Sequence, residues 1–152
     1  MLERGSKLFN AIRRKRSGTA AIEFGLAIPV LAVLLTAIVE IGFSMYQAKQ
    51  VSYGAEAGLF YAAQNGWNAA GIQNAAINAT GLTGTAATAS QFCGCPSSTG
   101  ITAASCSATC SDGSQPSQYI QINVSLARRS IIINSGFALP STISAQSILR
   151  QN

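Results

Sequence analysis

The stretch that decides the architecture of this chain is Arg13-Arg14-Lys15-Arg16-Ser17-Gly18-Thr19-Ala20-Ala21-Ile22-Glu23-Phe24. Four cations precede a glycine, and a carboxylate follows that glycine at the fifth position. From Phe24 to Val39 the chain then has no Asp, Glu, Lys, Arg, Asn or Gln. A charge in a membrane-length apolar segment costs about 2.5–3.5 kcal/mol at mid-bilayer and less near the edge. Glu23 is therefore expected to have a partner and a function.

The apolar segment predicts a membrane span. Thr19 to Tyr46 carries only Glu23 and Glu40 as charges and is long enough, as a helix, to cross a hydrocarbon core of about 30 Å. Glu40 follows Glu23 by seventeen residues, roughly 25 Å along a helix, which predicts a position at the outer membrane boundary. A secretory signal peptide is disfavoured because the apolar region is too long and Ser44-Met45-Tyr46-Gln47 is a poor cleavage site.

The charges of the chain predict its orientation. Residues 1–18 hold six basic residues against Glu3, a net charge of +5, and the remainder of the chain sums to zero. The positive-inside rule places the basic end in the cytoplasm and the carboxy-terminal part across the membrane. No basic face is visible on the remainder, so we expect no nucleic-acid partner.

Catalytic residues are scarce. The chain has no His, which excludes ordinary His-based acid–base catalysis and His-containing triads. It shows no phosphate-binding glycine loop and no carboxylate pair. We therefore expect neither an enzyme nor a cofactor.

Beyond the membrane the helix is predicted to continue to about Gln64 and to end at Asn65-Gly66, where glycine can adopt a left-handed cap. Its apolar residues form a loose one-sided stripe, and small residues beside that stripe allow another helix to approach closely. The stripe packs either against the following domain or against neighbouring helices. Its members are Phe43, Tyr46, Val51, Ala55, Leu59 and Ala62, and the small residues are Gly54, Ala55, Ala57 and Gly58.

The rest of the chain predicts a second helix and several strands. The helix runs from Asn68, its N-cap, to about Ala79. Alternation of Ile120, Ile122, Val124 and Leu126 with polar residues predicts a half-buried strand. Three strands over a helix would form a small α+β unit with an antiparallel sheet. The strand segments are Thr85–Phe92, Tyr119–Leu126 and Thr142–Leu149, with Ile131–Ile133 extending or following the second.

Four cysteines, Cys93, Cys95, Cys106 and Cys110, lie in a segment rich in Ser, Thr, Gly and Pro, which predicts a loop. An exported location permits disulfides, and bridges between the two pairs are favoured because a Cys93–Cys95 ring is very small. A four-thiolate zinc site is the alternative, although the spacings are not those of zinc knuckles and no His is present. We favour disulfides and expect no metal.

The segment Gly18-Thr19-Ala20-Ala21-Ile22-Glu23-Phe24 resembles the processing site of prepilin-like proteins of the type IV filament superfamily. The longer pattern from Arg16 to Pro29 is similar to the TadE-like branch, the minor pseudopilins of the Tad (Flp) pilus system. Further likeness comes from Glu40-Ile41-Gly42-Phe43, from the Ala-rich helix over residues 55–63, and more loosely from residues 91–150.

The resemblance implies a precursor. A prepilin peptidase cuts after Gly18, which makes Thr19 a new and commonly N-methylated terminus, and the basic leader Arg13-Arg14-Lys15-Arg16 holds the site at the cytoplasmic face. Glu23, followed by Phe24, then pairs with the terminal amine of a neighbouring subunit during assembly. Major pilins of this system are much shorter, so the length of this chain favours a minor subunit.

The predicted organisation is a cleaved leader over residues 1–18, a transmembrane and extended helix over 19–66, and a disulfide-stapled exported domain over 67–152. Implied partners are the prepilin peptidase, other pilins and pseudopilins, the inner-membrane assembly machinery and the lipid bilayer. Implied roles are pilus assembly, secretion and cell adhesion. Two alternatives stay open, namely a single-pass protein with an exported binding or structural domain outside any filament, and a membrane-tethered zinc module.

Overall fold

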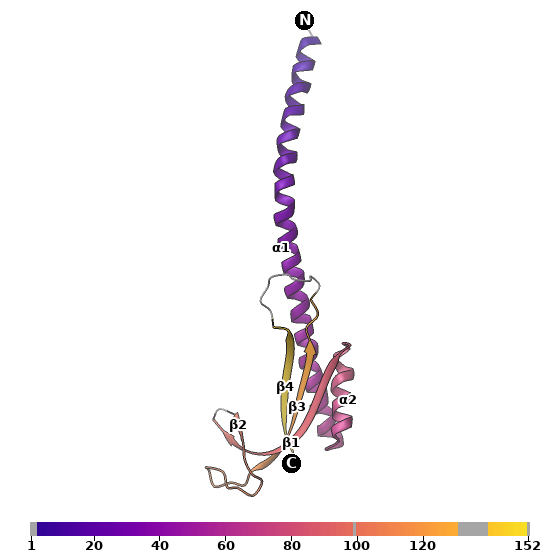
Figure 1. Cartoon of the computed structure of the whole chain (residues 1–152). Coiled ribbons are helices and arrows are strands. Elements are labelled where there is room, and N and C mark those ends of the chain that lie inside the picture. Colours follow the sequence, from indigo (N-terminus) through magenta and orange to yellow (C-terminus); the bar gives the residue numbers. More distant parts are fainter. Residues whose placement is uncertain (1–2, 99, 131–139, 152) are drawn as a thin grey trace. The chain divides into compact units, whose positions relative to one another are not determined.

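The computed structural model describes residues 3–98, 100–130 and 140–151, with side chains from Gly18 onward. Figure 1 labels its helices and strands. The chain divides into two compact units, Met1–Gly42 and Phe43–Asn152, so the first helix contributes to both. The elements are α1 (Glu3–Asn65), α2 (Ala69–Thr80), β1 (Thr85–Ser97), β2 (Gly100–Ala103), β3 (Ser117–Ala127) and β4 (Thr142–Gln151).

The first unit consists of α1 alone among the described residues. Gly18–Asn65 is the one described helix that is long and apolar enough to cross a membrane, judged by length and composition. Its large apolar side chains, such as Leu26, Leu31 and Val33, are exposed. Water would disfavour a surface of this kind, whereas lipid accepts it.

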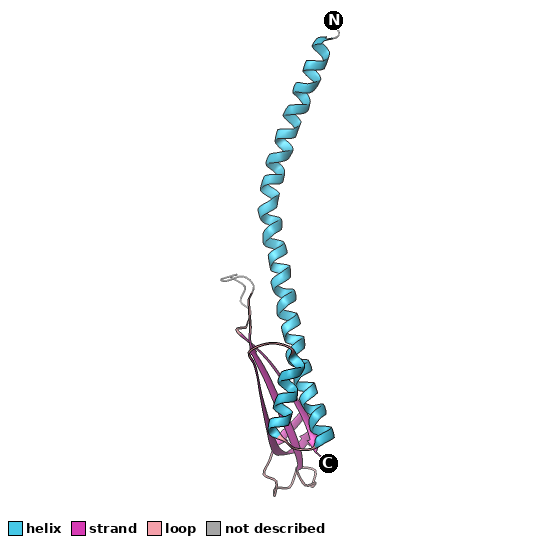
Figure 2. Cartoon of the chain, turned by 90° about the vertical axis from the view of Figure 1, so that its right-hand side faces the viewer, coloured by secondary structure: helices cyan, strands magenta, loops and turns pink. Residues whose placement is uncertain are grey.

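The second unit is a four-stranded antiparallel sheet in the order β2-β1-β3-β4. The part of α1 from Phe43 to Asn65 and the whole of α2 cover one face of the sheet (Figure 2). This arrangement confirms the predicted fold class, a long apolar amino-terminal helix followed by a small α+β domain with an antiparallel sheet.

Strand β3 supplies the centre of the core. Its Ile120, Ile122, Val124 and Leu126 are buried, while the intervening residues are half-buried, as the alternating pattern predicts. Both neighbouring strands pair with β3 along nearly its full length. On one side β1 pairs from Thr85 opposite Leu126 to Gly94 opposite Ser117, and on the other side β4 pairs with β3 over a similar length. Tyr119 is also buried, and its ring stacks on that of Phe92, its cross-strand neighbour, at 5.6 Å.

The ends of the two helices follow from local chemistry. Gly66 has φ 72° and donates its backbone N–H to Ala62 O at 2.9 Å, which stops α1 where the sequence predicts. Asn68 caps α2, because its side-chain oxygen accepts the N–H of Gly71 at 3.0 Å. Gly81, in the left-handed region, closes the other end of α2.

Helices α1 and α2 are in close contact at two glycines. A Cβ built on Gly54 would lie 2.8 Å from Ala76 O, and one built on Gly58 would lie 3.1 Å from Ala76 Cβ. Val51, Ala55 and Ala62 of the predicted stripe are in the core, and Leu59 packs against it. The stripe therefore packs within the chain, whereas Tyr46, also predicted to belong to it, is exposed.

Two predictions about the carboxy-terminal part need correction. Cys93 and Cys95 lie on β1, which continues to Ser97, and β2 pairs back on it, so only part of the cysteine segment is loop. The sheet accordingly has four strands instead of the predicted three. The β-hairpin was missed because Ser, Thr, Gly and Pro favour turns locally, and pairing across the strands outweighs that preference. The predicted strand at Ile131–Ile133 lies outside the described residues.

Candidate processing site and the disulfide-braced domain

The predicted processing and assembly residues lie on α1 in the first unit. Gly18, Thr19, Glu23 and Phe24 are all exposed. A Cβ placed on Gly18 would meet no described atom within 4 Å other than those of its chain neighbours and of the adjacent helix backbone. The structure describes only the backbone, which is helical, for the leader residues Arg13, Arg14, Lys15 and Arg16.

The helix sets the relation between Thr19 and Glu23. The two residues are four apart and therefore lie on the same side of the helix, about one turn or 6 Å from each other along the axis. A second helix shifted by about one turn would bring its own Thr19 level with this carboxylate. The spacing from Gly18 to Glu23 is thus compatible with contact between staggered parallel helices.

Glu40 differs from the exposed Glu23. Its side chain is only 1% exposed, and it takes part in an interaction within the described residues. A buried carboxylate is unfavourable unless such interactions satisfy it. The sequence places Glu40 only by its distance along the helix, which carries no information about burial.

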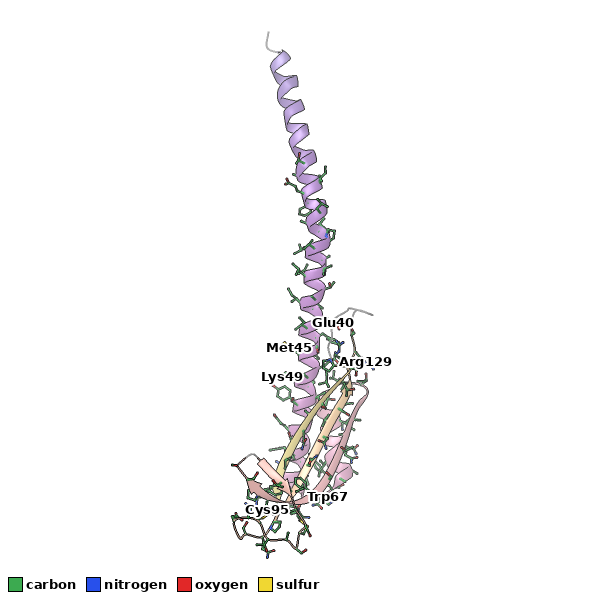
Figure 3. All side chains as sticks on the ribbon, turned by 60° about the vertical axis from the view of Figure 1, so that its left-hand side comes forward. Glu40, Met45, Lys49, Trp67, Cys95 and Arg129 are labelled. Atoms are coloured by element: carbon green, nitrogen blue, oxygen red, sulfur yellow. A yellow bond between two sulfur atoms is a disulfide. The ribbon has the colours of Figure 1, made fainter. Side chains whose placement is uncertain are left out.

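All four cysteines form disulfides in the second unit. Cys93 bonds Cys106 and Cys95 bonds Cys110, with Cα–Cα distances of 5.1 and 5.6 Å. The predicted bridging between the two pairs is confirmed, and every cysteine is bonded. A zinc site needs thiolates, and sulfurs bonded to each other are not available as such ligands. The bridges lie at one end of the sheet, where Cys95 is labelled (Figure 3).

The segment after the bridges is ordered by its own polar groups. Asp112 accepts hydrogen bonds from the backbone N–H of Ser114 at 2.9 Å and from its hydroxyl at 2.7 Å. These bonds stabilise the charged form and hold the pKa of the Asp112 carboxyl below its ordinary value of 3.8. Cys110 N–H donates to Ser114 O at 2.9 Å, so the turn is tied directly to a bridged cysteine.

Gln47 joins α1 to the chain that leaves β3, a link that the sequence did not predict. Its side-chain Nε2 donates to Arg129 O at 3.0 Å, and its Oε1 accepts from Arg129 N–H at 3.2 Å. The side chain is 2% exposed, yet both ends of its amide are satisfied. A lone Gln on a helix gives no signal of this pairing, because the partner is backbone 82 residues away.

Taken together, these features define a chain with one candidate membrane span and a small α+β domain braced by two disulfides. A protein-family model described as TadE-like protein matches residues 18–59, which confirms the resemblance to the TadE-like family seen in the sequence. No curated protein and no solved structure gives a significant match to the chain. The TadE-like match is consistent with involvement in the Tad pilus system and with association with the membrane.

Proposed function

We propose that this chain is the precursor of a minor pseudopilin that takes part in assembling a Tad (Flp) pilus for surface adherence. The observation that carries the proposal is the TadE-like match, which begins at Gly18, includes Glu23 and runs along the apolar part of α1. A prepilin peptidase cuts the chain after Gly18 and leaves Thr19 as the terminus. Glycine suits such a site because it has no side chain to obstruct an extended backbone.

The charge distribution supports the orientation in this proposal. Every excess positive charge precedes Thr19, so the leader stays at the cytoplasmic face of the inner membrane, beside anionic lipid head groups. The domain with the two disulfides then lies outside the cytoplasm, where such bonds persist. The partners are other pilins and pseudopilins, the peptidase and the inner-membrane assembly machinery.

Glu23 is the assembly residue in this account. Cleavage creates a cationic amine at Thr19, and a neighbouring subunit shifted by about one helical turn presents that amine to Glu23. Opposite charges at about 4 Å attract by roughly 4 kcal/mol at an effective dielectric near 20. This attraction offsets the cost of holding the carboxylate at the bilayer edge and fixes the register between subunits.

Replacing Glu23 tests the assembly role. We expect Glu23→Ala and the isosteric Glu23→Gln to be cleaved after Gly18 as in the wild type, but to lower the number of pili at least tenfold. Glu23→Asp, which keeps the charge, serves as the matched control and should retain more pili than either. Pili are counted by electron microscopy in cells lacking the wild-type chain. Normal piliation in the Gln variant would refute the charge pairing.

A further inference from the structure

Strand β4 forms a long edge of the sheet in the second unit (Figure 1). It has ten residues and pairs with β3 without interruption, from Thr142 opposite Ala127 to Gln151 opposite Gln118. The strand at the other edge, β2, has only four residues. Natural sheets commonly protect a long edge with Lys, Pro or a bulge. Strand β4 has no Lys, no Pro and a continuous register, so its edge is unprotected.

One hydrogen bond shows which backbone groups of β4 point outward. Arg128 N–H donates to Ser141 O at 2.8 Å, and this pair is the next step of the register after Ala127 opposite Thr142. Bonded pairs recur at every second residue of an antiparallel ladder, so the odd-numbered residues of β4 bond to β3. The N–H and C=O groups of the even-numbered residues therefore point away from β3. These residues are Thr142, Ser144, Gln146, Ile148 and Arg150.

A pocket adjoins the carboxy-terminal end of this edge. It has a volume of about 380 Å³ and lies between the end of α1 and the strands β3 and β4. Gln151, at its wall, accepts a hydrogen bond at its Oε1 from Gln91 Nε2 at 2.8 Å, which fixes this amide in place. The lining is otherwise mainly small or apolar. It comprises Ala62, Ala63 and Gly66 at the end of α1, and Ile120 and Leu149 on the sheet.

Arg150 gives this end of the edge a positive charge. It is the one charged residue of β4, it is exposed, and it also lines the pocket. It makes no ion pair and no side-chain hydrogen bond with the residues that the structure describes. An acidic side chain opposite Arg150 on an added strand would form a favourable cross-strand pair. A second β4 has no acidic residue, so two copies meeting at this edge would lack that complement.

We propose that β4 binds an extended segment of another protein by strand addition, with an acidic side chain beside Arg150 and an adjacent apolar side chain in the pocket. Adjacent residues of a strand point to opposite faces, which suits a charge on the face of Arg150 and an apolar group on the face of Leu149. The outward backbone groups supply affinity, and the pocket and the charge supply specificity. The proposal uses only the second unit, so it goes beyond the proposed function and does not depend on it.

Peptide selection against the purified full-length chain in detergent tests the proposal. The probe is a phage-displayed library of random linear peptides, and selected peptides are then synthesised. We expect them to carry an acidic residue next to an apolar one in a run of β-forming residues. Binding should slow amide hydrogen exchange at Ser144, Gln146, Ile148 and Arg150 by about tenfold or more.

Three results of this experiment would overturn the proposal. One is a library that yields no binder, and another is a set of peptides that protect a different segment or lack the acidic residue. The third is slow exchange at the same β4 amides without peptide, rising with protein concentration, which would identify a second copy as the occupant.

Gln146→Pro separates strand addition from the stability of the sheet. Proline has no N–H, and because the N–H of Gln146 points away from β3, the ladder within the sheet is kept. We expect peptide binding to weaken at least tenfold by calorimetry, whereas the matched control Gln146→Thr, which keeps its N–H, should bind as the wild type does. Equal binding by a folded Pro variant would contradict strand addition.

Two further variants test specificity without a change in the backbone. Arg150→Glu should weaken binding at least fivefold, and a peptide with Lys in place of its acidic residue should restore it. Ala63→Phe places a large ring at the pocket and should also weaken binding at least fivefold. Its matched control is Ala70→Phe, at an exposed position of α2 that does not line the pocket. Failure of the charge exchange, or equal effects of the two Phe variants, would refute the assigned contacts.

Discussion

Gln47 is a polar side chain buried on the core side of α1, and its contribution can be measured. Gln47→Leu removes both partners of the Arg129 backbone and leaves its N–H and carbonyl unpaired. We expect a loss of about 1–3 kcal/mol in the free energy of unfolding. The measurement is chemical denaturation of the purified chain in detergent. Gln64→Leu, at an exposed position of the same helix, should change stability by less than about 0.5 kcal/mol.

Asp112 makes the stability of its turn dependent on pH. Its folded pKa lies below the ordinary value of 3.8, so the charged form is favoured in the folded state. The stabilisation is therefore present above the unfolded pKa and is lost as the pH falls through the lower folded pKa. An NMR titration should place the Asp112 pKa below 3.8, and Ser114→Ala should raise it. An unchanged pKa in that variant would show that Ser114 is not the cause.

At the residue scale, the sequence predicts which residues form disulfides or cap helices better than it predicts which polar side chains are buried. The four cysteines, the Asn68 cap and Gly66 were all predicted, because each acts through neighbours in the chain or through its own reactivity. The burial of Gln47 and of Glu40 was not predicted. Burial of a single polar residue depends on distant segments, which leave no local pattern.

At the scale of elements, the approach of α1 to α2 depends on two glycines. Gly54→Ala gains helix propensity of about 1 kcal/mol, but its Cβ would lie 2.5 Å from Thr80 Cγ2 and 2.8 Å from the carbonyl oxygen of Ala76. Because that oxygen is backbone, the clash prevails, and we expect a net loss of about 1–3 kcal/mol. Thermal unfolding measures it. Gly42→Ala, with open space around its Cβ, should be neutral or stabilising.

The two bridges should stabilise the end of the sheet where β2 pairs with β1. Replacing Cys93 and Cys106 together by Ser opens a bridge of sequence separation 13 without leaving a free thiol. We expect a loss of about 2–4 kcal/mol in the free energy of unfolding. Denaturation under oxidising conditions measures it, with the wild type in reductant as the comparison. A variant as stable as the oxidised wild type would show that the bridge does not brace the domain.

Element limits were predictable where periodicity and caps agree. Helix α2, strand β3 and the end of α1 match their predicted limits within about two residues, because apolar spacing and end signals point the same way. The start of α1 does not match, since the helix begins at Glu3 and was predicted from residue 19. The extension of β1 through Cys95 and the existence of β2 were not predictable. Their stability comes from cross-strand pairing, such as Cys95 opposite Thr102, and the intrinsic preferences of Ser, Thr and Gly do not reveal it.

At the scale of the whole molecule, the apolar helix and the braced domain present different surfaces. The side chains around Phe24 and Leu31 are exposed and apolar, as lipid requires. The second unit has its own core of α1, α2 and sheet residues. The sequence predicted this contrast because composition alone distinguishes a membrane-length segment from a domain. The structure of the chain alone does not reveal cleavage after Gly18, since cleavage would depend on a second protein.

The most direct test of the account is the mass of the amino-terminal peptide from membranes of cells that contain the prepilin peptidase. Cleavage should give a chain beginning at Thr19, with or without N-methylation. The same chain should begin at Met1 in cells without the peptidase, and also in a Gly18→Val variant, whose side chain obstructs the site. A chain that still begins at Met1 where the peptidase is active would contradict the pseudopilin function and leave an anchored, disulfide-braced domain.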